Sequence, residues 1–410
     1  MKKRRVPPSI PVSKSNEADN LPAGQTAPNE AVPVDDDGWA IFRRQWRQLD
    51  WSLVWTILAV KVVIFVFGVQ SYLTWMNKPL EKWSDWLEIW NRWDSLRHIR
   101  LAQIGYKGVG SERADLIGFP LFPWLVRLVA VIFQDYLISG FIVSGLALIA
   151  AGLLLHKLVR ADFPDSTARN SVWFMLIFPT AYFLHINYNE SLFIALTVGC
   201  FLAARRGFWS LAGILGILVC LTRLNGLVIF PALLTEAFLQ YRTSRRWQRE
   251  WLWILAAPLG FGIYLLVNQY AAGDALAFMA VGRENFQKSL SAPWNGIGGV
   301  YNLMWSPEIA LAQMGGVQEF VFIALGAVAT IACGFALRSS YTVWMAGNWF
   351  LFASSGFILS VPRYTLVMFP IYILFARLAE RRFWHSVITV WSLLLMAFFI
   401  TKLVQGHWAF

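Results

Sequence analysis

Residues 51–73 read WSLVWTILAVKVVIFVFGVQSYL, an apolar run interrupted by one charged residue, Lys61. A helix needs roughly 17–25 mostly apolar residues to cross about 30 Å of hydrocarbon, so this run predicts a membrane-spanning helix. Similar runs recur along the chain and are separated by short, often arginine-rich connections. A β-barrel would instead show short segments of alternating hydrophobicity, which the sequence lacks. We therefore expect an all-α polytopic membrane protein.

The composition supports this expectation. Of the 410 residues, 57% are hydrophobic and only 14% are charged, whereas a soluble domain carries about 25% charged residues. The net charge of +11 comes from basic residues between apolar runs. There they are typical of cytoplasmic loops and lipid-headgroup contacts, so nucleic-acid binding is not expected. Cys200, Cys220 and Cys333 lie inside apolar runs without metal-ligand spacing, and we expect them to be small core residues.

Residues 1–40 form a polar, proline-rich segment that begins with several basic residues. No apolar region follows at the distance typical of a cleaved signal peptide. We expect a disordered cytoplasmic tail. The absence of an endoplasmic reticulum signal favours the plasma membrane of a bacterium, with the endoplasmic reticulum membrane as the alternative for a eukaryotic source.

The basic connections also predict sidedness. Arg43, Arg44 and Arg47 place the start of the first span in the cytoplasm by the positive-inside rule. Two long polar loops, 74–136 and 272–316, then fall on the external side. Further apolar stretches are found near 118–134, 137–158, 170–186, 190–204, 208–222, 225–240, 251–271, 317–337, 342–359, 364–379 and 384–404.

One stretch conflicts with a simple alternation of spans. Lys157, Arg160 and Arg169 should be cytoplasmic, which requires an odd number of crossings between loop 74–136 and residue 157. The stretch 118–134 contains two prolines and an arginine. We therefore expect an interfacial or re-entrant helix there, with a short conventional span as the alternative. About 11 transmembrane helices and an external C-terminus remain.

Asp94 is the first candidate for chemistry, in the loop sequence NRWDSLRH at 91–98. A carboxylate beside aromatic residues, shortly after a span, is well placed to remove a proton from an attacking hydroxyl. Alternatively, Asp94 is a solvated or salt-bridged loop residue. His98 is a lone histidine, like His185, so neither is expected to bind a metal.

Four more ionisable residues lie in or beside apolar runs. Arg223 and Arg363 could grip a phosphate bidentately, or could instead reach the outer interface. Glu190 could cap the following helix or join the active face. Lys61 could pair with a neighbour or reach a lipid phosphate. No Walker loop, dinucleotide fingerprint, nucleophile elbow or zinc pattern is present.

Several of these segments together resemble the PIG-V family, the GPI mannosyltransferase 2-like members of the GT-C glycosyltransferases. The resemblance covers roughly residues 50–410. Each block is weak alone, but their order is that of the family. The matching blocks are Arg92-Trp93-Asp94, Gly105-Tyr106, 119–123 (FPLFP), 189–191 (NES), 222–226 (TRLNG), 273–278 (GDALAF) leading to Pro293-Trp294, and 362–364 (PRY).

The resemblance implies a GT-C fold with a conserved module over 41–271, a second external loop over 272–316 and C-terminal transmembrane helices over 317–410. It implies an inverting transfer of mannose from a polyprenyl- or dolichyl-phosphate carrier to a hydroxyl acceptor at the non-cytoplasmic face. The acceptor is a glycolipid, a glycan or a protein. The family usually has an aromatic residue near the position of His98, and this departure leaves the acceptor open.

In this reading Asp94 is the catalytic base, while Arg223 and Arg363 bind the donor phosphate. Supporting or substrate-binding roles then fall to Arg92, Trp93, His98, Tyr106, Glu190, Asn225 and Tyr364. Arginines could replace a metal at a monophosphate, so we expect neither metal nor cofactor. Membrane lipids and the lipid-linked sugar are the expected partners.

Two other functions remain open. A related GT-C enzyme could use another prenyl-linked sugar. A lipid or solute transporter or flippase would be expected to show internal repeats and paired broken helices, which the sequence does not show.

Overall fold

The computed structural model describes residues 50–410, and this part of the chain is helical with no β-strand; one isolated bridge joins Leu290 and Ser355. The expected all-α fold is confirmed. The predicted tail, with Arg43, Arg44 and Arg47, lies outside the described residues.

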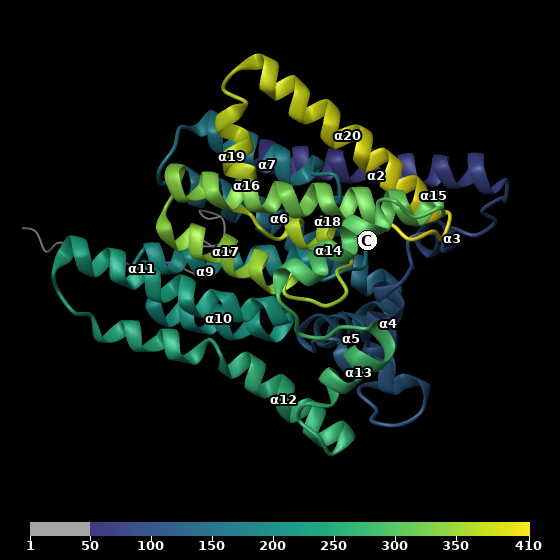
Figure 1. Ribbon diagram of the computed structural model, residues 1–410, viewed down its shortest axis with the longest axis horizontal. Helices are drawn as coiled ribbons and strands as arrows, with labels where there is room; N and C mark the ends of the chain where they lie inside the picture. The colour runs from purple at the N-terminus through teal and green to yellow at the C-terminus, as the bar shows by residue number, and fades with distance from the viewer. Residues whose placement is uncertain (1–49) are drawn as a thin grey trace, which may run out of the picture. The chain divides into compact units, whose positions relative to one another are not determined.

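Six helical segments in the described part of the chain are long and apolar enough to cross a membrane. Figure 1 shows most of them as long helices, some of which run obliquely to the others. They are α2 (Trp51–Met76), α6 (Tyr136–Val159), η2 with α11 (Leu224–Val228 and Ile229–Ser244), η3 with α12 (Arg249–Ala256 and Leu259–Ala272), α15, η4 and α16 (Ile309–Leu311, Ala312–Gln318 and Glu319–Ala336), and α20 (Arg382–Val404).

The other predicted spans fall on shorter helices. Even the longest of these, with 16 residues, measures about 24 Å at 1.5 Å per residue and is shorter than the hydrocarbon layer. Proline accounts for some of the interruptions, because α7 ends just before Pro179 and α19 begins at Pro370. The count of about 11 spans stays a prediction. The shorter helices are α7 (Asp165–Ile177), α9 (Glu190–Arg205), α10 (Trp209–Thr222), α17 (Ser339–Ala353) and α19 (Pro370–Leu378).

The stretch 118–134 forms α5 (Leu121–Phe133), which makes an angle of 112° with the preceding η1 (Ser111–Ile117). Its 13 residues span about 20 Å. Phe122 is buried on one side, while Ile132 is exposed on the other. This geometry suits a re-entrant helix or a broken span, so the interfacial placement stays a prediction.

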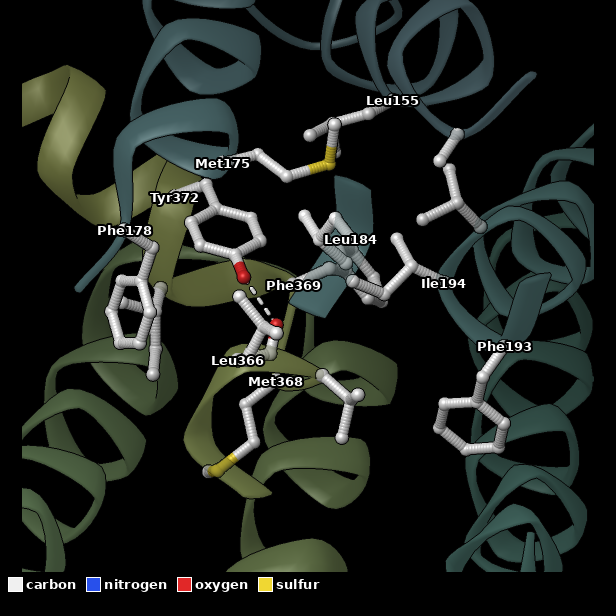
Figure 2. Packing of buried hydrophobic residues seen from close by; sticks show 14 of the residues in the cluster. Leu155, Met175, Phe178, Leu184, Phe193, Ile194, Leu366, Met368, Phe369 and Tyr372 are labelled. Atoms are coloured by element: carbon white, nitrogen blue, oxygen red, sulfur yellow. Dashed lines mark hydrogen bonds between the residues drawn. The ribbon is translucent and has the colours of Figure 1, made fainter. Parts of the chain in front are cut away.

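The core is formed by apolar side chains from helices distant in sequence. Figure 2 shows Met175 from α7, and Phe178 directly after that helix, beside Tyr372 from α19. The hydroxyl of Tyr372 donates a hydrogen bond to the carbonyl of Leu366, so this buried polar group is satisfied. The three cysteines are buried and unbonded, as expected for small core residues: Cys200, Cys220 and Cys333.

The two predicted long loops contain helices that pack against each other. Leu116 of η1 is buried with Ala277 and Val281 of α13 (Ala277–Phe286). Arg113 and Glu284 add an exposed ion pair between the same elements. In Figure 1, α13 lies beside α4 (Asp94–Ile104) and α5, toward the right. The α11–η3 and α16–α17 connections lie toward the left. The smaller loop helices are α3 (Asp85–Glu88), α8 (Tyr182–His185), α14 (Pro293–Leu303) and α18 (Val361–Leu366).

Candidate active site

Asp94 is the first residue of α4 and follows a sharp backbone turn. Trp93 has a φ of 51°, a conformation that residues other than glycine rarely adopt. The Trp93 ring packs edge-on against Trp408, with ring centroids 5.2 Å apart. The turn places the Asp94 carboxylate at a helix N-terminus, where the helix dipole favours a negative charge.

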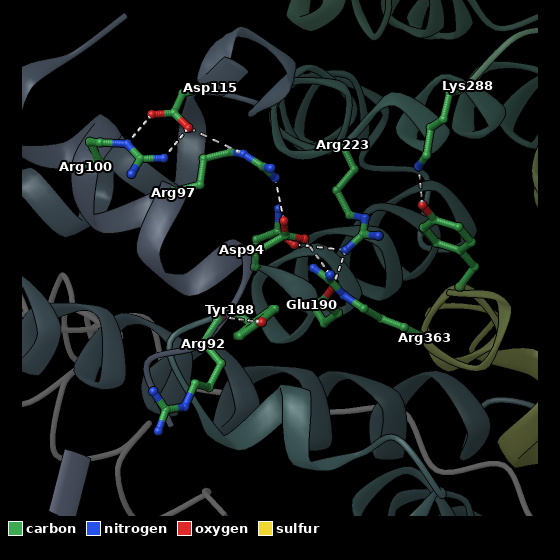
Figure 3. A network of polar contacts seen from close by, with 12 residues as sticks. Arg92, Asp94, Arg97, Arg100, Asp115, Tyr188, Glu190, Arg223, Lys288 and Arg363 are labelled. Atoms are coloured by element: carbon green, nitrogen blue, oxygen red, sulfur yellow. Dashed lines mark hydrogen bonds and ion pairs between the residues drawn. The ribbon is translucent and has the colours of Figure 1, made fainter. Parts of the chain in front are cut away.

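Two arginines hold the Asp94 carboxylate (Figure 3). Arg97, one turn along α4, pairs with one oxygen, and Nη1 of Arg363 donates to the other at 2.6 Å. Burial alone would raise the pKa of Asp94, but the charges of Arg97 and Arg363 outweigh it. They hold the pKa of Asp94 well below its usual range. The carboxylate is therefore ionised at neutral pH.

Arg363 joins Asp94 to a second carboxylate. Its Nε donates to Glu190, and its guanidinium lies over the ring of Tyr188 at 4.7 Å. Glu319 accepts the backbone N–H groups of Ser360 and Val361, at 2.6 and 2.7 Å, and so fixes the start of α18, which carries Arg363. Arg363 is thus held at its guanidinium group by two carboxylates and at its backbone by the fixed start of α18.

Glu190 begins α9 and is fully buried. It pairs with Arg223 as well as with Arg363, and Nη1 of Arg223 also donates to Asn189 at 2.9 Å. A buried carboxylate is costly unless paired. Both guanidinium groups contact Oε1 of Glu190, while Oε2 is buried and has no hydrogen-bond partner among the described residues. Glu190 is the first residue of α9, after the N-cap residue Asn189, and its side chain joins this group of charges. Its place on an active face stays a prediction. We call Asp94, Arg97, Glu190, Arg223 and Arg363 the central cluster.

The central cluster carries an excess of positive charge. Three guanidinium groups face two carboxylates. The Asp94 side chain is 29% exposed, while those of Arg223 and Arg363 are 11% and 8% exposed. A mostly buried site with one uncompensated positive charge favours an anionic ligand.

Sequence reasoning missed Arg97 and Asp115. Asp115 accepts two hydrogen bonds from Arg100, at 2.5 and 2.7 Å, and lies 3.6 Å from Nε of Arg97. The ring of Phe286 from α13 lies under Arg97 at 5.3 Å. The signal for Arg97 was its position three residues after Asp94, which places both on one face of a helix.

His98 is buried, and neither of its ring nitrogens has a hydrogen-bond partner among the described residues. Its ring packs edge-on against Phe122 and Tyr188. Burial lowers the pKa of His98 to about 4, although Asp94 and Glu190 act in the opposite direction. The imidazole is neutral at pH 7, so it contributes no charge to the cluster.

The other predicted supporting residues lie at different distances from the cluster. The Arg92 carbonyl accepts the hydroxyl of Tyr188 at 2.8 Å, while its side chain points away from Asp94 (Figure 3). Tyr106 donates to the carbonyl of Gly118 at 2.8 Å and packs against η1 and α13 instead.

Asn225 and Tyr364 flank Arg223. Asn225 donates to Asn348 at 2.7 Å, and the Tyr364 ring lies 5.9 Å from the Arg223 guanidinium carbon. Lys288, from the second long loop, donates to the Tyr364 hydroxyl at 2.9 Å. No pattern in the sequence indicates a role for this lysine.

Lys61 lies apart from the cluster and takes the predicted alternative of pairing with a neighbour. Its Nζ donates to the carbonyl of His185. Within residues 50–410, no three His, Cys, Asp or Glu side chains are grouped so as to hold a metal ion.

No protein-family model matches the chain, and neither does any curated protein. PIG-V membership therefore stays a prediction. Among solved structures, the chain is similar to ArnT from Cupriavidus metallidurans bound to undecaprenyl phosphate, with 14% identity and a TM-score of 0.48 over 81% of this chain and 61% of that one. It is also similar to the Archaeoglobus fulgidus oligosaccharyltransferase tethered with an acceptor peptide, with 12% identity and a TM-score of 0.42 over 86% and 55%. The chain thus spans little more than half of each of these proteins, and likenesses this loose carry no argument about its reaction.

Proposed function

We propose that this protein is an inverting GT-C mannosyltransferase. It transfers mannose from a polyprenyl- or dolichyl-phosphate carrier to a hydroxyl acceptor on the external side of a membrane. The observation that carries the proposal is one cluster in which Asp94 pairs with Arg97 and Arg363, and Glu190 joins Arg363 to Arg223. The reaction needs a base for the acceptor hydroxyl and cations for the leaving phosphate, and the central cluster contains both.

The bond changes assign a task to each charged group. The acceptor oxygen forms a bond to the anomeric carbon as the bond from that carbon to the phosphate oxygen breaks. Asp94 takes the acceptor proton, and the electron pair of the broken bond leaves with the prenyl phosphate. Arg223 and Arg363 stabilise the charge that grows on the phosphate, which is a good leaving group without protonation. This assignment requires neither metal nor cofactor. We assign supporting or substrate-binding roles to His98, Trp93 and Tyr364.

The arginines that hold Asp94 also control its basicity. In the free protein Arg97 and Arg363 keep the carboxylate ionised but weakly basic. A donor phosphate competes with Asp94 for one of these two groups, Arg363. Its arrival loosens the hold of Arg363 on Asp94 and raises the affinity of the carboxylate for a proton. Donor binding thus prepares the base.

This mechanism predicts two different pH profiles. Asp94 is ionised well below neutral pH, and burial lowers the pKa of His98 to about 4. We therefore expect kcat/KM for the donor, which reports the free protein, to stay level from about pH 5 to 8. The acid limb of kcat, which reports the donor complex, should have its midpoint at higher pH than that of kcat/KM. If steady-state rates give the same midpoint for the acid limbs of kcat and kcat/KM, donor binding does not change the pKa of the base.

Arg223 tests the phosphate assignment. Arg223→Ala should raise the donor KM about tenfold or more, because a hydrogen bond to a charged group contributes about 1.5–3 kcal/mol. Glu190 keeps Arg363 as its partner in this variant, so folding should survive. Arg206→Ala is a matched control, since Arg206 is exposed and has no ion pair among the described residues. Unchanged donor KM and kcat in Arg223→Ala would exclude the phosphate role.

The setting we propose is the plasma membrane of a bacterium, with the N-terminus in the cytoplasm and the central cluster on the opposite side. In a eukaryote the corresponding membrane would be that of the endoplasmic reticulum. The acceptor is a glycolipid, a glycan or a protein.

A donor screen separates this function from its alternatives. Purified protein is supplied with prenyl phosphates that carry mannose or other sugars, and release of the prenyl phosphate is measured. Mannose should be the preferred sugar. Release only with another sugar would indicate a related GT-C transferase. Movement of intact lipid between leaflets without release would indicate a flippase.

A further inference from the structure

A second polar site lies at the far end of helices that start near the central cluster. η2, which leads into α11, starts directly after Arg223, and α16 starts where Glu319 binds the residues before Arg363. Their other ends, with the start of α17, line an open cavity of about 750 Å³. Its lining residues are Leu239, Gln240, Arg242, Thr243, Ser244, Gln248, Leu337, Arg338 and Ser339. Cavities of about 300–1,000 Å³ are typical of small-ligand sites.

The wall of this cavity already contains one neutralised charge. Glu236 is fully buried and accepts hydrogen bonds from Arg338 at 2.7 Å and from Ser340 at 2.8 Å. Arg338 is therefore balanced by Glu236. Because Glu236 is already paired with Arg338, it does not neutralise any other positive charge at the cavity.

Arg242 supplies that uncompensated charge. It lines the cavity and has no acidic partner in the described part of the chain, and the same holds for Arg245, Arg246 and Arg249 just beyond it. In another short connection Arg205 is paired with Asp162, and a single arginine there, Arg206, has no ion pair among the described residues. The group thus concentrates free guanidinium charge beside a polar cavity, an arrangement that favours a phosphate.

The surroundings indicate that this phosphate belongs to a lipid. Leu234 and Phe238 are exposed on α11 and lead toward the cavity, and Trp247 is 69% exposed beyond it. α11 with η2 is one of the six long apolar segments. Exposed apolar side chains on a span followed by tryptophan and arginine are typical of the boundary between hydrocarbon and headgroups. A soluble phosphate would make no use of the apolar strip.

From these observations we infer that the cavity between α11 and the α16–α17 turn binds the phosphate of an anionic phospholipid in the leaflet opposite the central cluster. Arg242 contacts the phosphate, Ser244 and Ser339 offer hydroxyl groups, and the acyl chains lie along α11. The inference does not depend on the proposed reaction.

Lipid retention tests the site. The full-length protein is reconstituted in phosphatidylcholine vesicles with a minority of phosphatidylglycerol, extracted in mild detergent and analysed for bound lipid by mass spectrometry. The wild-type protein should be enriched in phosphatidylglycerol over the vesicle ratio. Arg242→Glu should lower this enrichment about tenfold, because it removes a charged hydrogen bond. Arg242→Gln, which adds no negative charge, should also lower it several-fold.

Arg382→Glu is the matched control, because Arg382 is an exposed arginine outside the cavity and the change in net charge is the same. It should retain wild-type enrichment. Equal loss in both charge reversals, or no enrichment in the wild-type protein, would overturn the inference. Inorganic phosphate added at the concentration of the bound lipid should not displace it. Displacement at that concentration would overturn the lipid assignment. Melting temperatures within the wild-type range confirm that each variant is folded.

Discussion

Asp94→Asn is expected to lower kcat by about 10²–10⁴-fold, the range that general-base catalysis contributes. An amide keeps the size of the carboxylate but has no basic oxygen for the acceptor proton. It also releases Arg97 and Arg363 from their ion pairs, which should leave donor binding intact or strengthen it. We therefore expect a low kcat with an unchanged or lower donor KM. Initial rates of prenyl phosphate release at varied donor concentration measure both quantities.

Asp274→Asn provides the control for this substitution. Asp274 is an exposed aspartate in the second long loop, outside the central cluster, and its side chain accepts only the backbone N–H of Leu276 among the described residues. The same chemical change there should leave the rate within about twofold, as expected for a surface position. Near-normal turnover in Asp94→Asn, with wild-type folding, would remove Asp94 as the base.

Arg363→Gln is expected to affect both folding and activity. The Arg363 guanidinium links Asp94 to Glu190, and Glu190 is fully buried. Breaking a buried ion pair by removing one partner costs about 3–5 kcal/mol, because the remaining charge stays desolvated. We expect a clear fall in melting temperature and at least about a 100-fold loss of kcat/KM, since one phosphate-binding cation is also lost.

Two further variants separate the effect of Arg363→Gln on stability from its effect on activity. Arg363→Lys keeps the charge but cannot contact both carboxylates through one planar fork, so stability should recover more than activity. Arg377→Gln is the control, because Arg377 is exposed on the neighbouring helix and donates one hydrogen bond to the Ala336 carbonyl. Wild-type stability and activity in Arg363→Gln would contradict the role of Arg363 as the bridge of the cluster.

Much of the site could be predicted from the sequence because the sidedness of the membrane restricts which charged residues can meet. Charged residues at the ends of apolar runs have only two sides of a membrane to occupy, so the pattern of basic connections grouped Asp94, Glu190, Arg223 and Arg363 on one side. The structure brings these four side chains into direct contact. Their catalytic and binding roles stay predictions.

Other features depend on contacts that a linear pattern does not contain. Asp115 and Lys288 look like ordinary loop charges until the chain folds. Only then does Asp115 reach Arg97, and Lys288 reach Tyr364. Glu319 begins an apolar run, and its partners at 360 and 361 are about forty residues away in the sequence.

The lengths of the membrane spans were the feature that the sequence predicted least well. An apolar run indicates an apolar environment, but it does not distinguish lipid from a protein core. The residues of α9 are almost all buried within the protein, although their composition predicted a span like any other. Breaks such as the one before Pro370 shorten these helices further.

The central claim is that Asp94 and its arginines transfer a sugar from a lipid phosphate. The most direct measurement supplies prenyl-phosphate-mannose and a hydroxyl acceptor to proteoliposomes and follows the anomeric configuration of the product by NMR, for the wild-type protein and for Asp94→Asn. The account predicts a mannosylated product of inverted configuration and free prenyl phosphate with the wild-type protein, and neither with the variant. Recovery of intact donor from the wild-type protein, or a product of retained configuration, would contradict it.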